Sequence, residues 1–393
     1  MEETTPARNF GRWRGKATLV IGVSLLCLLA AEAVSRLAVG SIPQLDLDIY
    51  RKSTDGELLL RPGVTRRHST RHWDVTVSIN EEGWRDRPGF GSAEDSLILG
   101  LGDSFAFGWG VELEDSMFFL LEQELRERNP VRLLKAGVPG TGPGDQLRLL
   151  QTLGQTFGPK DQPSAVVLIF FVGNYFVDVQ MGGARQFQVE TGLLVRQNFL
   201  HGTPRAFDLL PADAVRKSRL LQFLMGTWWQ WSRPGDEGGP DVVHTPRRWD
   251  EWLREFARIH LQQYPPRTSK AVTQTLDLLT EMHQTCRSRS ADFLLAVVPR
   301  SYQVYENEAE ELKTSLDLSD DDLYLDKPQR ILKEWAERSG VPVVDLLGFF
   351  REHHRTHPQQ RLFYYPDAHL NPLGHRVAAD AIQPVLARLL DNR

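Results

Sequence analysis

The stretch Leu97-Ile98-Leu99-Gly100-Leu101-Gly102-Asp103-Ser104 joins an apolar run directly to a Gly-Asp-Ser turn. A short apolar run bounded by turn residues is typical of a buried strand in a parallel sheet. The order strand, Gly-Asp turn and Ser puts the Ser104 hydroxyl at the carboxyl end of that strand, where open α/β sheets bind their ligands. A Gly-Asp-Ser tripeptide alone is usually just a turn, so the rest of the chain decides its meaning.

A second motif, Asp367-Ala368-His369, lies near the other end of the chain. It supplies an imidazole base with a carboxylate two residues upstream. A serine hydroxyl becomes a nucleophile when a base takes its proton and a third group orients that base. We therefore predict Ser104 as the nucleophile, His369 as the base and Asp367 as the orienting acid.

Two segments between these motifs end in residues that can donate hydrogen bonds. A predicted strand at 131–136 precedes a glycine-rich loop at 137–144, and a predicted strand at 165–172 ends in Gly173-Asn174. A loop glycine N–H, the Asn174 amide and the Ser104 N–H would together form an oxyanion hole. Turn formation is the alternative interpretation of the glycines, and loop capping is the alternative for Asn174.

Taken together, these blocks resemble the SGNH (GDSL-type) hydrolases, in particular membrane-anchored members of the bacterial envelope type. The segment from Asn80 to Arg85 resembles their Asn-x-x-Gly-aromatic-Arg lead-in, and the segment from Asp367 to His375 resembles their closing motif. The resemblance covers residues 75–178 and 290–390, and is loose outside the motifs.

The resemblance implies a role for each matching residue. Ser104 is the expected nucleophile, His369 the base and Asp367 the orienting acid, while Ser104, Gly140 and Asn174 are the expected oxyanion donors. It implies no cofactor and no metal.

The chain departs from the family pattern at two places. Many members have Asp-x-x-His where this chain has Asp-x-His, and many have Asp after the third-block Asn where this chain has Tyr175. Asp178 is therefore the alternative orienting acid. Gly137 is the alternative to Gly140 as the loop donor.

Composition agrees with a globular enzyme. Of the 393 residues, 41% are hydrophobic and 25% are charged, and the net charge of −5 gives no indication of nucleic-acid binding. Cys27 lies in the apolar N-terminal run, so an intramolecular disulfide with Cys286 is not expected. His353, His354 and His357 are interpreted as a solvated helix face and not as a zinc site.

The N-terminus predicts membrane targeting. An uncharged run at 17–31 follows a basic segment, and apolar residues continue to Val39. This pattern favours an uncleaved single-pass anchor with a cytoplasmic N-terminus and an extracytoplasmic remainder. Ala31-Glu32-Ala33 has the form of a signal-peptidase site, which leaves secretion after cleavage as an alternative. A soluble amphipathic helix is a further alternative. The basic residues are Arg8, Arg12, Arg14 and Lys16.

We expect three regions along the chain. These are a basic tail and anchor at 1–40, a lead-in segment at 41–94 that includes a strand at 72–79, and a hydrolase-like domain at 95–393. Strands alternate with helices, which predicts a three-layer α/β/α sandwich with a five-stranded parallel sheet, the flavodoxin-like SGNH fold. The predicted strands are 96–101, 131–136, 165–172, 293–298 and 341–345, and the predicted helices are 115–128, 144–154, 268–290, 326–339 and 372–391.

An insertion at about 180–266 interrupts this alternation and is rich in tryptophan. It is interpreted as a helical appendage, with a lid, an acceptor-binding surface or a membrane-surface contact as alternatives. The tryptophans are Trp228, Trp229, Trp231, Trp249 and Trp252. The acidic stretch at 306–322 is interpreted as a solvated loop or helix face.

The sequence thus predicts a membrane-anchored serine esterase. Its substrate would be an ester, with a short, acetyl-like acyl group on a cell-envelope polysaccharide or lipid, as the resemblance implies. The alternatives are an O-acyltransferase that uses the same Ser-His-Asp site, and a catalytically inactive carbohydrate-binding or assembly protein.

Overall fold

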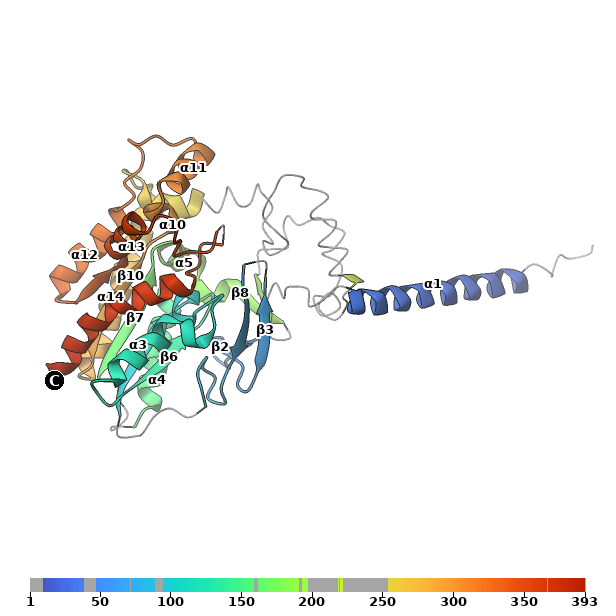
Figure 1. Cartoon of the computed structure of the whole chain (residues 1–393), viewed down its shortest axis with the longest axis horizontal. Coiled ribbons are helices and arrows are strands. Elements are labelled where there is room, and N and C mark those ends of the chain that lie inside the picture. Colours follow the sequence, from blue (N-terminus) through green and yellow to red (C-terminus); the bar gives the residue numbers. More distant parts are fainter. Residues whose placement is uncertain are drawn as a thin grey trace, which may run out of the picture. The chain divides into compact units, whose positions relative to one another are not determined.

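The structure is a computed structural model that describes ten stretches of the chain. They are residues 10–38, 47–70, 72–88, 95–158, 162–190, 193–196, 218, 220–221, 254–365 and 367–392. The chain divides into two compact units, one of residues 1–44 with 200–241 and one of residues 45–199 with 242–393. Each unit is described by itself (Figure 1).

The first unit contains the long N-terminal helix α1 (Phe10–Ala38). Its segment Thr18–Arg36 has a mean hydropathy of 2.1 and is long and apolar enough to cross a membrane. A signal sequence has the same properties. The Glu32 carboxylate, which interrupts the apolar run, accepts hydrogen bonds from Arg36 Nε at 2.7 Å and Ser218 Oγ at 2.8 Å.

The second unit is built on a five-stranded parallel sheet with the strand order β11-β10-β7-β5-β6. Every residue of the central strand β7 is buried, as expected for a strand covered on both faces. The sheet confirms the predicted architecture. Its strands are β5 (Ser96–Gly102), β6 (Val131–Gly137), β7 (Ala165–Phe171), β10 (Asp292–Val298) and β11 (Val343–Asp345).

Helices cover both faces of this sheet (Figure 1). One group contains α3 and α14, which contact each other, and α13, which contacts α14; the other contains α4, α5 and α12, which all contact α9. The three layers agree with the predicted α/β/α sandwich. These helices are α3 (Met117–Arg126), α4 (Pro143–Thr156), α5 (Tyr175–Met181), α9 (Pro266–Ser288), α12 (Lys327–Ser339), α13 (Leu346–Thr356) and α14 (Pro372–Asp391).

Several elements were not predicted. Two short 3-10 helices, at Leu113–Asp115 and Arg258–His260, and helices α5, α10 (Ser301–Val304) and α13 were missed. The first part of the acidic stretch forms helix α11 (Glu306–Leu316). The side chains of Leu312 and Leu316 on this helix pack in a small apolar cluster. His353 and His354 lie on α13, which agrees with the helical part of their interpretation, but both side chains are half-buried and not fully solvated.

The insertion is described at its two ends and at residues 218 and 220–221 between them. A 3-10 turn at Gly183–Gln186 leads into an antiparallel hairpin of β8 (Phe187–Glu190) and β9 (Leu193–Arg196). The five tryptophans on which its interpretation rests lie outside the described residues.

The lead-in segment forms two antiparallel hairpins. They pair β1 (Tyr50–Lys52) with β2 (Leu58–Leu60) and β3 (Thr65–Ser69) with β4 (Asp74–Ser78). Their buried side chains form one apolar cluster with Phe107 and Val138, which follow the strands β5 and β6.

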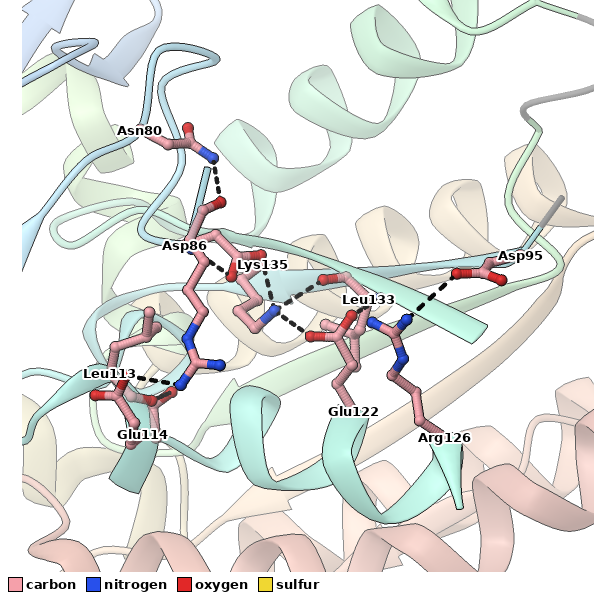
Figure 2. A network of polar contacts seen from close by, with 11 residues as sticks. Asn80, Asp86, Asp95, Leu113, Glu114, Glu122, Arg126, Leu133 and Lys135 are labelled. Atoms are coloured by element: carbon pink, nitrogen blue, oxygen red, sulfur yellow. Dashed lines mark hydrogen bonds and ion pairs between the residues drawn. The ribbon is translucent and has the colours of Figure 1, made fainter. Parts of the chain in front are cut away.

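A buried cation also joins the lead-in to the sheet. Lys135 of β6 is 4% exposed, and its ammonium lies 2.7 Å from Asp86 Oδ2 and 2.6 Å from Glu122 Oε2 (Figure 2). Burial raises the pKa of Asp86, and the nearby Lys135 opposes that shift. A buried amine with two carboxylate partners is a satisfied charge, whereas the loss of one partner would be costly.

Candidate active site

Ser104 begins the short helix α2 (Ser104–Phe107) directly after β5. The turn requires glycine at position 102, because φ is +154° there and a Cβ would lie 2.5 Å from Ala106 Cβ. Asp103 caps α2 by accepting a hydrogen bond from Phe105 N at 3.0 Å. The Ser104 hydroxyl is therefore held at the carboxyl edge of the sheet.

His369 joins Ser104 to Asp367 through its two ring nitrogens. Nε2 lies 2.8 Å from Ser104 Oγ, and Nδ1 lies 2.5 Å from Asp367 Oδ1. The intervening Ala368 has a φ of +67°, a left-handed conformation that is uncommon for alanine. This turn lets the carboxylate fold back onto its own histidine, so the Asp-x-His spacing permits the contact.

The electrostatics of the pair fit a histidine base. Burial lowers the pKa of His369, but the charge and hydrogen bond of Asp367 outweigh this and leave the pKa above its usual value. The pKa of Asp367 is lowered, because the attraction of His369 outweighs the effect of burial. Asp178, the alternative orienting acid, lies on α5 and packs against the backbone of Gly142. The two residues are so close that a Cβ added at Gly142 would lie 2.8 Å from the Asp178 Cβ.

The two candidate loop glycines have different surroundings. Gly137 ends β6 opposite Gly102, and a Cβ there would lie 2.4 Å from Phe107 N. Close packing of β6 against α2 thus accounts for this glycine. Gly140 lies in the loop after β6 with a φ of +82°, which favours glycine for conformational reasons.

Asn174 precedes α5, and its side chain is held by Asp103. Nδ2 of Asn174 donates to Asp103 Oδ2 at 3.2 Å. An acid at the end of another strand, Asp103, thus supplies a hydrogen-bond acceptor for the Asn174 amide. Tyr175 is buried and donates to the Ile169 carbonyl at 2.9 Å. Sequence reasoning missed this role of Asp103, although the residue stands directly before Ser104.

The lead-in segment contributes side chains near this site, which sequence reasoning also missed. The His68 and Trp109 ring centroids lie 4.6 Å apart, and Trp109 lies 6.2 Å from His369. Burial lowers the pKa of His68 to about 4, so its ring is neutral, and Nδ1 accepts from Trp73 Nε1 at 3.2 Å.

Arg85 of the lead-in holds the chain that follows α2. It is 2% exposed, and it donates to the Phe107 carbonyl at 3.0 Å, the Val111 carbonyl at 2.5 Å and the Gly108 carbonyl. Burial lowers its pKa to about 10, so it stays cationic at neutral pH. A cation at the end of a helix also complements the helix dipole.

Comparison with known proteins assigns the family. The model of the GDSL-like lipase/acylhydrolase family matches residues 101–377, well over half of the chain. The chain belongs to this family. The matched region contains Ser104, Gly140, Asn174, Asp367 and His369, and the family assignment confirms the resemblance drawn from the motifs.

Several solved esterase structures, some of them of the GDSL type, are similar to this protein at low sequence identity. The crystal structure of TesA has 13% identity and a TM-score of 0.39, with 75% of this chain and 99% of that chain covered. The psychrotrophic esterase EstA from Pseudoalteromonas sp. has 13% identity and a TM-score of 0.36, with 76% and 100% covered. The acetyl xylan esterase AlAXEase has 14% identity and a TM-score of 0.38, with 74% and 98% covered. No curated protein sequence matches the chain.

The position of Asp103 leads to a prediction about activity and stability. In Asp103→Asn, a side chain that still caps Phe105 N would turn its own NH₂ toward the Asn174 NH₂, so Asn174 would lose its acceptor. We expect kcat to fall at least about tenfold, because small displacements of catalytic groups are costly. Steady-state kinetics of the purified variant would measure the loss.

The thermal stability of Asp103→Asn is not expected to fall with its activity. Burial raises the pKa of Asp103 to about 6 from 3.8, so its stabilising contribution is present below pH 3.8 and is lost as the pH rises through about 6. Asparagine carries no such loss. We therefore expect the Tm of Asp103→Asn at pH 7 to be no lower than wild type, and a lower Tm with unchanged kcat would refute this assignment.

Proposed function

We propose that this protein is a serine esterase whose nucleophile is Ser104. The observation that carries the proposal is the hydrogen-bonded chain from Ser104 Oγ through His369 to Asp367, with distances of 2.8 and 2.5 Å. Few arrangements other than nucleophile activation use a serine, a histidine and a half-buried carboxylate in this order.

The proposed reaction has two halves. Ser104 Oγ attacks the ester carbonyl carbon as His369 Nε2 takes its proton, and the same proton then passes to the departing alcohol. Water repeats the sequence on the acyl-enzyme, which releases the acid and restores Ser104. Asp367 holds the imidazole in the tautomer that accepts at Nε2.

Three donors would stabilise the tetrahedral oxyanion. They are the Ser104 N–H, the Gly140 N–H and the Asn174 amide, and the loss of one such donor typically costs about 3 kcal/mol in transition-state stabilisation. The Asp103 contact supports this role for Asn174, because it fixes the orientation of the amide.

We further propose a short, acetyl-like acyl group on a cell-envelope glycan or lipid. The Phe105 ring lies 5.1 Å from the His369 ring, and Phe105 and Phe171 lie 4.0 Å apart. This aromatic crowding beside the base supports a small acyl group.

An ester panel tests this proposal. Detergent-solubilised full-length protein would be incubated with p-nitrophenyl esters of two to twelve carbons, roughly the range that separates acetyl from fatty acyl groups, with and without an acetylatable glycan. Fastest turnover on the acetyl ester supports the short-acyl proposal, and fastest turnover on the longest ester contradicts it. Acetyl groups found on the glycan would identify transfer in place of hydrolysis.

We propose that α1 anchors the catalytic unit outside the cytoplasm. Four basic residues precede the apolar segment and Arg36 follows it, a bias that keeps the N-terminus in the cytoplasm. We expect a C-terminal alkaline-phosphatase fusion to be active and a C-terminal green-fluorescent-protein fusion to be dark. The opposite pair of results would refute export and the envelope substrate, but not the esterase chemistry.

A further inference from the structure

Arg300 is a buried cation at the carboxyl edge of the sheet. It lies just beyond β10, is 8% exposed and forms no ion pair with a carboxylate among the described residues. Its guanidinium carbon lies 5.0 Å from the Phe171 ring centroid and 4.4 Å from that of Phe256. A buried charge held by two aromatic faces and no acid needs an explanation beyond stability.

The polar partner of this guanidinium is the main chain beside Asn174. Arg300 Nη2 donates to the Gly173 carbonyl at 3.3 Å. The pairing of β7 with β10 brings Arg300 and Gly173 together. Phe171 pairs with Val298, and Val172 N donates to the Val298 carbonyl at 3.1 Å.

Gly173 has no space for a side chain. A Cβ would lie 2.2 Å from Arg300 Nε and 2.4 Å from Phe171 Cζ. The guanidinium therefore packs directly on the peptide that leads into Asn174. Asp103 holds the amide of Asn174 at 3.2 Å, so the Gly173-Asn174 unit is fixed at its main chain and at its side chain.

We propose that Arg300 is a positioning residue for the oxyanion donor Asn174 and acts through the Gly173 carbonyl. The inference rests on the proposed esterase function. A donor aimed at a developing oxyanion works only if its position is set before the reaction. The planar guanidinium, which bonds and stacks at once, suits this task better than an ammonium group.

The charge of Arg300 also acts on the base His369. Three charged groups act on the pKa of His369: Asp367 beside it, Asp103 before α2 and Arg300 after β10. His369 in turn acts on the pKa values of two further histidines, His68 of β3 and His375 of α14. Both other histidines are neutral, since burial lowers their pKa values to about 4 and about 3. Arg300 is thus the cation that opposes the two carboxylates and lowers the pKa of His369.

Three variants separate position from charge. Arg300→Met removes both, so we expect kcat to fall at least about tenfold with KM nearly unchanged, and the acidic limb of the pH–kcat/KM profile to move to higher pH. Arg300→Lys keeps the charge, so kcat should fall while the limb stays near wild type. Gly173→Ala keeps Arg300 but crowds it, and should also lower kcat without moving the limb.

Arg289 offers a matched control. It also packs on a glycine, Gly154, and donates to the Leu150 and Gln151 carbonyls at 2.9 and 3.3 Å, but it precedes β10 and so lies at the opposite sheet edge. We expect Arg289→Met to keep the wild-type kcat and pH profile.

The experiment uses full-length protein in detergent with an acetyl ester, and circular dichroism to verify folding. Wild-type kcat and pH profile in folded Arg300→Met would overturn the proposal. If that variant does not fold, wild-type kcat in both Arg300→Lys and Gly173→Ala would overturn it. Activity that survives Ser104→Ala would instead refute the esterase assignment, so the two failures are distinguishable.

Discussion

Ser104→Ala is expected to remove ester hydrolysis, with kcat reduced by a factor on the order of 10⁴ or more. The substitution deletes the oxygen that lies 2.8 Å from His369 Nε2 and leaves no atom to attack the carbonyl. It removes a partly exposed hydroxyl at the start of α2, where no core packing is lost. Turnover of an acetyl ester by the purified variant measures the effect.

Ser164 provides the matched control for this variant. Its hydroxyl donates to the Leu97 carbonyl at 2.9 Å and lies before β7, at the amino edge of the sheet. Ser164→Ala should therefore keep its activity. If Ser104→Ala turned over substrate at the wild-type rate with an unchanged circular dichroism spectrum, the nucleophile would be another residue.

Asp367→Asn is expected to lower kcat by a factor of about 10³ to 10⁴ while KM changes little. An asparagine amide facing Nδ1 can hold the imidazole in the wrong tautomer, with a proton on Nε2. The carboxylate raises the pKa of His369, so its removal should also shift the acidic limb of the pH–rate profile to lower pH. Steady-state kinetics between about pH 5 and pH 9 would record both effects, since this range brackets the ordinary histidine pKa.

Asp178→Asn distinguishes the two candidate acids. Asp178 lies on α5 and Asp367 lies in the loop before α14, so the substitutions act at separate places. A near-wild-type kcat in Asp367→Asn together with a large loss in Asp178→Asn would reverse the assignment.

The sheet could be predicted because its signals are local. Most of the strands are largely apolar runs that end in turn residues, and their alternation with helices implies parallel order. Helix α13 was missed because it follows β11 without a loop, although Asp345 accepts from Leu347 N at 3.0 Å as an N-cap. The lead-in hairpins depend on pairing such as Tyr50 with Leu60, and alternation within one strand does not specify its partner.

The site could be predicted where one residue type carries one chemical role. Ser104, Asp367 and His369 are of this kind, and the structure brings them into contact. The supporting groups are different, because Arg300 meets Gly173 only after two strands have paired. The left-handed backbone of Ala368 is equally hidden, since alanine rarely adopts it.

The hydrogen bonds from Arg85 to the carbonyls after α2 determine where a truncated form of this protein can begin. A fragment that starts at residue 95, where the sheet begins, would lack the Arg85 donor for those carbonyls. It would also expose Phe107 and Val138 to solvent, because the lead-in side chains that cover them would be absent. It would also take Asp86 away from Lys135. The shortest fragment that we expect to fold alone therefore begins near Leu47. The turn that carries the nucleophile depends on residues that precede it in the chain by about twenty positions or more, such as Arg85.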